Sequence, residues 1–262
     1  MKNILWSFVF VLCASGICSA QSVLYFPQFA DGRTDTNSNI AWGTFIGVTN
    51  PAAVGTPAAS VTITLKKDDG TPINLTLLDP TSGAPVGSTF QLGGGQTKVL
   101  VSPSNGVPLV PLNVGFATVT SNLPVTAGLI FIEYGPPTGN PISEAGVLAA
   151  TPLTRQGIVA VRYAGVPGSL NTEPAVAIAN PGAGTATIAF QLLDSSGTAV
   201  DSPVTRTLAA NNHTAFFVSQ LFPNIPSIFF GTMRITSDNP IVGTALTFSG
   251  NLFATIPVFP LQ

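Results

Sequence analysis

The chain has 262 residues, of which 9 are basic and 11 acidic, giving a net charge of −2 with the single histidine neutral. Charged residues make up 8% of the sequence, whereas typical soluble domains have about 25%. A nucleic-acid-binding protein needs a basic patch to neutralise phosphates, and the longest basic run here is Lys66-Lys67. The composition therefore excludes nucleic acid as a partner.

The first twenty residues are typical of a secretory signal. Lys2 gives a basic start, residues 4–12 are apolar, and Cys18-Ser19-Ala20 provides small residues before a cleavage point. We expect a mature protein that begins at Gln21 and is secreted, either to the periplasm or to the cell exterior. Both cysteines would be lost with the signal, which leaves neither a disulfide nor a thiolate site. The apolar run is shorter than the ~20 residues of a membrane helix, so we expect no transmembrane segment in the mature chain.

A loop rich in oxygen ligands follows the first apolar segment of the mature chain. Its spacing imitates the start of a calcium loop, but Ile40 and Ile46 stand where an EF-hand has Gly and Glu. A plain polar loop is the favoured interpretation, and calcium is the alternative; no other cofactor is expected. The calcium candidates are Asp31, Asp35, Asn37 and Asn39.

Short alternating segments separated by turn residues predict β-strands. Residues 61–66 alternate apolar and polar side chains, which is typical of a half-buried strand. Asp68-Asp69-Gly70 then predicts a turn, and Asp194-Ser195-Ser196-Gly197 predicts a second one. No stretch has sustained helical periodicity. The sequence therefore predicts an all-β protein.

Two segments of the chain recur in the same order. Residues 45–51 and 175–181 both read as a strand closed by Asn-Pro, and residues 115–124 match residues 231–240 without a gap. The first apolar run ends in Phe29-Ala30 in one half and in Tyr163-Ala164 in the other. Because a recurring pattern indicates repeated structural units, we predict two copies, 21–154 and 155–262, with the boundary near Thr154.

About seven strands per copy, spaced by turns, favour two tandem antiparallel β-sandwich domains of the immunoglobulin-like kind. Three landmarks resemble an uncharacterised exported bacterial β-sandwich repeat family: residues 26–32, the strand ending in Asn50-Pro51, and residues 143–147. Copy two departs from the pattern where Gly165 follows Ala164. The resemblance implies the fold and the compartment, and it implies no activity.

The candidates for catalysis are few, and we assign no catalytic residue. Glu133, Glu144 and Glu173 are the acids considered for a glycosidase-type carboxylate pair. Glu133 interrupts an apolar run, and the favoured interpretation is a strand end with the carboxylate in solvent. His213 is the only histidine and lies in Asn211-Asn212-His213-Thr214, which predicts an exposed turn. A single histidine and no mature cysteine also leave no zinc ligand set.

Pairs of phenylalanines in copy two predict a contact surface. Neighbouring residues of a strand point to opposite faces, so both rings of a pair cannot enter one core. We expect an outward ring in each pair to face copy one or a separate partner; the alternative is that loops of the same copy cover them. The candidates are Phe216, Phe217, Phe222, Phe229 and Phe230.

Together these features predict a non-catalytic extracellular module, structural or adhesive, that contacts a protein or cell-surface partner. The alternative is a carbohydrate-binding or carboxylate-based glycan-active protein, which would need exposed aromatic platforms or paired carboxylates.

Overall fold

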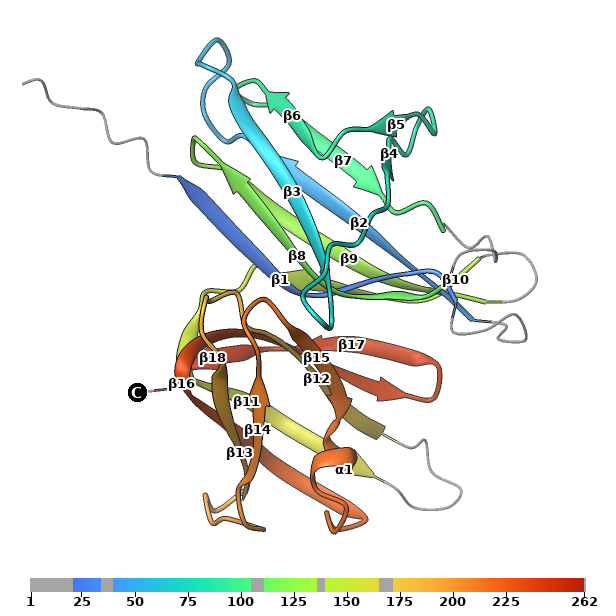
Figure 1. Cartoon of the computed structure of the whole chain (residues 1–262). Coiled ribbons are helices and arrows are strands. Elements are labelled where there is room, and N and C mark those ends of the chain that lie inside the picture. The colour runs from blue at the N-terminus through green and yellow to red at the C-terminus, as the bar shows by residue number, and fades with distance from the viewer. Residues whose placement is uncertain (1–20, 34–39, 105–110, 136–139, 165–171, 262) are drawn as a thin grey trace, which may run out of the picture.

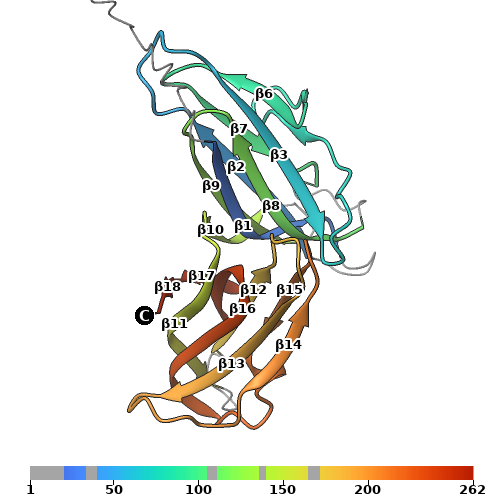
Figure 2. The same ribbon diagram turned by 60° about the vertical axis from the view of Figure 1, so that its left-hand side comes forward.

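A computed structural model describes residues 21–33, 40–104, 111–135, 140–164 and 172–261. The fold is all-β and consists of antiparallel sheets, as the sequence predicts, with one short helical turn, α1 (Val218–Leu221). Elements β1 to β10 form one body and elements β11 to β18 form a second, and the two are in contact (Figures 1 and 2). We call them unit one and unit two.

Unit one is a sandwich of two sheets. The first has the order β1-β8-β3-β6, and the second has the order β10-β9-β2-β7-β4-β5. The strands are β1 (Ser22–Asp31), β2 (Ala41–Thr49), β3 (Ala59–Lys67), β4 (Leu77–Leu78), β5 (Pro85–Val86), β6 (Thr89–Leu92), β7 (Thr97–Val101), β8 (Asn113–Ser121), β9 (Thr126–Tyr134) and β10 (Pro141–Leu148).

Unit two is one sheet that folds over on itself. Its first half pairs in the order β14-β13-β16-β11, while β16 also pairs with β12 and β17. The 22-residue strand β16 therefore belongs to both layers. The strands are β11 (Leu153–Ala164), β12 (Thr172–Ala179), β13 (Ala186–Asp194), β14 (Val204–Leu208), β15 (His213–Phe217), β16 (Ile228–Ser249), β17 (Leu252–Ile256) and β18 (Val258–Pro260).

The two units share one order of strand pairs. The pairs β1–β8, β8–β3 and β3–β6 of unit one have counterparts β11–β16, β16–β13 and β13–β14, in the same order, in unit two. The pairs β10–β9, β9–β2 and β2–β7 likewise correspond to β17–β16, β16–β12 and β12–β15. The predicted boundary near Thr154 falls at the start of β11.

The Asn-Pro segments have the same role in both units. Asn50 is 1% exposed, and its side-chain nitrogen donates to the Leu92 carbonyl at 2.9 Å. Asn180 is fully buried and donates to the Leu208 carbonyl at 2.9 Å. Because a buried amide must find partners, each asparagine fastens the end of one strand to a neighbouring layer.

The predicted turns are present. Gly70 has φ of 80° and donates its backbone N–H to the Lys67 carbonyl, and Gly197 has φ of 82° and donates to the Asp194 carbonyl. Glycine is favoured at such positive φ because it has no Cβ. These turns reverse the chain after β3 and β13.

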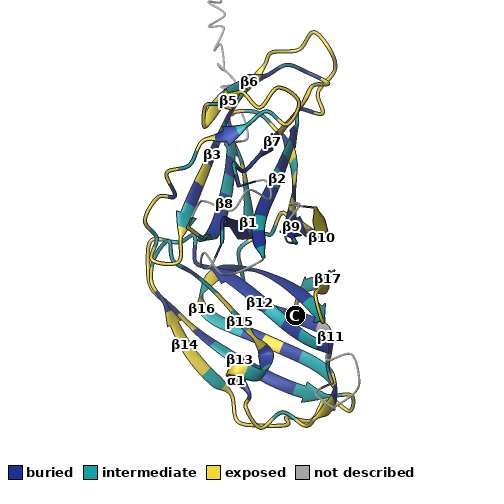
Figure 3. Ribbon diagram, turned by 90° about the vertical axis from the view of Figure 1, so that its right-hand side faces the viewer, coloured by how far each residue is buried: buried dark blue, intermediate teal, exposed yellow. Residues whose placement is uncertain are grey.

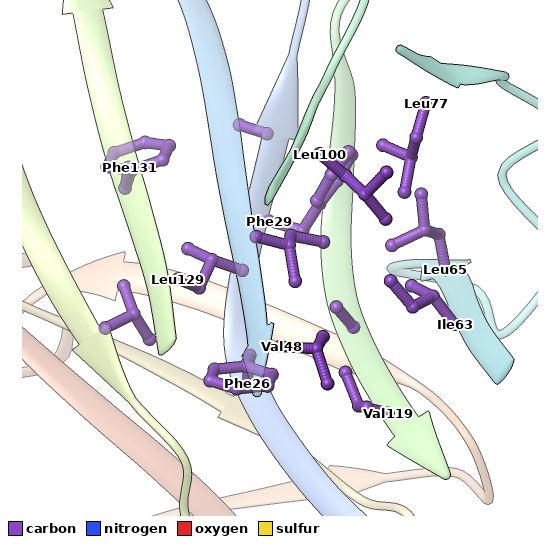
Figure 4. Close-up of a cluster of buried hydrophobic side chains, with 14 of the residues drawn as sticks. Phe26, Phe29, Val48, Ile63, Leu65, Leu77, Leu100, Val119, Leu129 and Phe131 are labelled. Atoms are coloured by element: carbon purple, nitrogen blue, oxygen red, sulfur yellow. The ribbon is translucent and has the colours of Figure 1, made fainter. Parts of the chain in front are cut away.

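The sandwich core of unit one contains rings and branched side chains from both sheets, including Phe26, Phe29 and Phe131 (Figure 4). Two residues of unit two, Leu246 and Phe253, belong to the same buried cluster. Exposed residues gather along β14 and in the loops far from the junction (Figure 3). The apolar interior of unit one therefore continues into unit two.

Candidate binding site between the two units

A polar clasp joins the β3 turn of unit one to the start of β15. The Nδ1 atom of His213 lies 2.7 Å from Oδ1 of Asp68, and the His213 backbone N–H donates to the Asp68 carbonyl at 3.1 Å. Lys66 Nζ donates to Oδ1 of Asn211 at 2.5 Å. The prediction of an exposed turn histidine is wrong, because His213 is 2% exposed. The neighbouring unit covers it, which a local sequence pattern does not reveal.

A second attachment between the units, which we call the seam, joins β10 to β17. Each of these strands lies at the margin of its own unit. The Phe253 N–H donates to Oγ of Ser143 at 2.9 Å, and that hydroxyl is 3.4 Å from the Phe253 carbonyl. The hydroxyl of Thr255 donates to the Gly146 carbonyl. These side chains satisfy backbone groups at the margin of each sheet, so the seam fixes the units beside one another.

A run of aromatic rings crosses the junction between these two attachments. Trp42 stacks on Phe131 with ring centroids 4.7 Å apart, and both rings contact Phe253 of unit two. Phe253 contacts Phe248 at 5.3 Å, and Phe248 contacts Phe217 at 5.4 Å. Aromatic pairs at these separations attract each other beyond their burial. The rings therefore form a continuous apolar wall from unit one to unit two.

This wall borders a cavity of about 290 Å³ between the units. Unit one contributes residues of β1, β2, β8 and β9, and unit two contributes residues of β12, β15, β16 and α1. Among the described residues, the lining is mainly apolar, its polar members are glutamines and a threonine, and no charged residue belongs to it. A half-enclosed apolar cavity with few polar groups is the usual form of a small-ligand site. It is the candidate functional site.

Gln28, one of the polar residues that line the cavity, lies in a β-bulge. The β1–β8 register shifts between Phe26 and Phe29, which sets Pro27 and Gln28 in the bulge. Phe26 and Phe29 are both fully buried in the core of unit one, although an unbroken strand would point them to opposite faces. Gln28 is then free to line the cavity.

The side-chain oxygen of Gln28 has no hydrogen-bond partner among the described residues. The residue is 8% exposed, and its Oε1 atom is buried with no hydrogen-bond partner in the part of the chain that the structure describes. A buried polar atom left without a partner costs about 1–3 kcal/mol. Gln28, one of the residues that line the cavity, therefore has a polar atom that a bound molecule can satisfy when the amide turns toward the cavity.

The structure distributes the five predicted contact phenylalanines among three environments. Phe216 and Phe217 line the cavity, and Phe222 and Phe229 belong to the core of unit two. Phe230 is 58% exposed and lies outside the cavity. Strand alternation holds for the β16 pair, since Phe229 is buried and Phe230 is exposed. The sequence did not identify Gln28, Phe131 or Phe248 as site residues.

The calcium candidates do not form a described site. Asp31 is fully buried, and its carboxylate accepts hydrogen bonds from the Ser104 backbone N–H at 3.0 Å and from the Ser104 hydroxyl at 2.8 Å. Asp35, Asn37 and Asn39 lie outside the described residues. Within the described ranges, no group of three or more His, Cys, Asp or Glu side chains is close enough to hold a metal ion.

No two of the three candidate glutamates form the carboxylate pair that a glycosidase needs. Glu133 is 4% exposed, so the interpretation of a solvent-facing carboxylate at a strand end is wrong. Burial raises the pKa of the Glu133 carboxyl above its usual range. Glu144 follows Ser143, the register partner of Glu133, so its side chain points to the opposite face of the sheet. The carboxylate of Glu173 accepts a hydrogen bond from the Ser219 hydroxyl in unit two.

Comparison with known proteins assigns no family. No family model and no curated protein matches the chain. Thermotoga maritima 1070 is 17% identical, with 42% of this chain and 92% of that chain covered and a TM-score of 0.30. Arthrobacter globiformis T6 isomalto-dextranase, complexed with panose, is 10% identical, with 84% and 36% covered and a TM-score of 0.26. The pilus backbone of Streptococcus pneumoniae is 11% identical, with 87% and 77% covered and a TM-score of 0.20. Likeness at this level indicates neither a relationship nor an activity.

Proposed function

We propose that the protein is a non-catalytic extracellular interaction module, structural or adhesive, that holds an apolar part of its partner in the cavity between the two units. The observation that carries the proposal is the cavity itself, which has aromatic walls from both units and, in the part of the chain that the structure describes, no charged lining residue. Burying a large apolar group there would contribute about 1.5–3 kcal/mol. The clasp and the seam hold the walls in place before binding, which lowers the cost of ordering them.

The secretory signal that the sequence predicts at residues 1–20 supports the extracellular location. Among the described residues there is no helix long and apolar enough to cross a membrane. The position of Phe217 supports a role in binding, because this ring lines the cavity and is still 36% exposed. Exposed aromatic rings beside an apolar cavity are typical of contact sites.

The arrangement of acids supports a role without catalysis. A glycosidase needs two carboxyl groups on either side of the scissile bond. Glu133 and Glu144 point to opposite faces of one sheet, and Glu173 lies in the other unit, where it is bonded to Ser219. The stacking of Trp42 on Phe131 also covers one face of that ring, which disfavours its use as a sugar platform.

Replacing the ring beside the cavity tests the proposal. Phe217→Ser should weaken attachment of the labelled mature protein to cells of the producing organism by about tenfold or more, because one apolar anchor is lost. Phe230→Ser is the matched control, since it removes an exposed ring outside the cavity, and it should bind like the wild type. Equal attachment by Phe217→Ser and the wild type would exclude the cavity as the contact site.

A further inference from the structure

We propose that the cavity between the units binds a small neutral molecule that is apolar over most of its surface and has one hydroxyl group, which bonds to the amide of Gln28. This inference goes beyond the proposed function: it assigns a free small molecule to the same cavity when the partner's apolar part is absent, so the two compete for one site. It concerns a free small molecule, and a side chain supplied by a protein partner is the alternative that the experiment distinguishes.

The size of the cavity limits the ligand. Its volume is about 290 Å³, close to the lower end of the range of about 300–1,000 Å³ for small-molecule sites. A molecule with one or two rings, or one ring with a short alkyl chain, fits such a space. A long sugar chain or a structured peptide does not.

The lining determines the charge of the ligand. An ion in this cavity would lose its hydration and find no charged side chain among the lining residues within the described ranges, which is costly in an apolar environment. Aromatic rings of Trp42, Phe131 and Phe248 offer flat apolar contacts instead. The lining therefore selects a neutral molecule, and an aromatic or alicyclic body fits the rings best.

The Gln28 amide determines the polar group. Its Oε1 atom is buried without a hydrogen-bond partner among the described residues, and Gln28 is one of the residues that line the cavity. The terminal amide torsion of glutamine is broad, so the group can turn toward a ligand. A hydroxyl both donates and accepts, and it satisfies either end of the amide. Water is a poor substitute, because an apolar cavity offers it few other partners.

The cavity is held open by contacts on two sides. The Asp68–His213 clasp lies at one side of the junction, and the seam from Ser143 to Phe253 lies at another. Cavities persist when the surrounding structure cannot collapse into them. The two attachments thus keep a space that a ligand can enter without moving the units apart.

A matched pair of ligands tests the proposal on the intact mature protein. Calorimetric titration compares 4-propylphenol with 4-propyltoluene, which replaces the hydroxyl by a methyl group. For ligands of about ten heavy atoms we expect dissociation constants of about 0.1–1 mM. The variant Gln28→Leu keeps the size of the side chain and removes the amide. We expect it to lower the preference for the phenol, relative to the wild type, by about tenfold.

The measured quantity is the ratio of the two dissociation constants, compared between the wild type and Gln28→Leu. This comparison cancels the different affinities of the two ligands for water. If both ligands bind the wild type and Gln28→Leu leaves the ratio unchanged, the role of Gln28 and the hydroxyl is overturned, while the proposed function stands. If neither ligand binds and Phe217→Ser still weakens attachment to cells, the small-molecule site is overturned and a partner's side chain is the occupant. If Gln28→Leu does not fold, Ala215→Phe replaces it. Ala215 is exposed and lines the cavity, so the added ring must abolish binding of both ligands; unchanged binding would overturn the site.

Discussion

Phe253 connects the two units, and removing its ring should separate their unfolding. The residue is on β17 of unit two but is 6% exposed within the core cluster of unit one. Its ring contacts Trp42 at 5.9 Å, Phe131 at 5.6 Å and Phe248 at 5.3 Å. Truncating a buried phenylalanine to alanine costs about 3–5 kcal/mol, and three lost ring contacts place Phe253→Ala in the upper half of that range.

Two probes follow the two units. Trp42 is the only tryptophan of a chain that begins at Gln21, so its fluorescence reports on unit one, whereas far-ultraviolet circular dichroism reports on both. We expect coincident thermal transitions in the wild type and separate ones in Phe253→Ala. Phe222→Ala is the control, since Phe222 is 1% exposed in the core of unit two, and it should lower a single shared transition. The reasoning would be refuted if Phe253→Ala kept coincident transitions and its free energy of unfolding fell by less than about 1 kcal/mol.

Three further predictions concern single positions and one fragment. A Cβ on Gly115 would lie 1.7 Å from the Lys66 carbonyl, whereas one on Gly128 would meet nothing within 4 Å; chemical denaturation should show Gly115→Ala destabilised by about 3 kcal/mol and Gly128→Ala within about 0.5 kcal/mol of the wild type. Burial raises the pKa of Glu133, so the wild type loses stability as pH rises from the ordinary glutamate pKa through the raised one. Glu133→Gln has no carboxylate to bury, so it should melt at a higher temperature than the wild type near pH 7 and show no such advantage near pH 4. An equal difference in melting temperature at the two pH values would contradict the raised pKa of Glu133. Residues 155–262 expressed alone should give a β-rich spectrum with a cooperative melt, at a lower temperature than the whole chain because Leu246 and Phe253 lose their cover; an unfolded fragment would show that unit two depends on unit one.

The sequence predicted the all-β fold because alternation and turn chemistry are local. Asp68-Asp69-Gly70 and Asp194-Ser195-Ser196-Gly197 form turns, and each Asn-Pro segment closes a strand. The comparison of Phe29-Ala30 with Tyr163-Ala164 was wrong by two residues, however. Phe29 is the register partner of Gly115, and the residue opposite Gly231 is Val161. Both strands contain a register shift at the equivalent place, so Phe26 corresponds to Ile158 and Phe29 to Val161. The recurrence of an aromatic residue before alanine placed the correspondence two residues too late.

The binding site was harder to predict because it lies between the units. Strand alternation placed Phe216 and Phe217 as contact candidates, and both line the cavity. Gln28 lines it because a bulge changes the direction of its side chain, and Phe248 does so because β16 crosses from one layer to the other. Glu133 and His213 were expected in solvent because the residues next to them in sequence are typical of a strand end and a turn. Their burial depends on how distant segments pack, which no local pattern contains.

The emission of Trp42 tests most directly whether the cavity between the units is a binding site. Trp42 lines the cavity, so a molecule that enters displaces water from its ring. Titrating 4-propylphenol into the mature protein should shift or quench this emission in a saturable way, and Ala215→Phe, which fills the cavity, should abolish the change. Ala58→Phe adds the same ring at an exposed position of unit one outside the cavity and should respond like the wild type. An emission that does not respond in the wild type, or that responds equally in Ala215→Phe, would contradict the account.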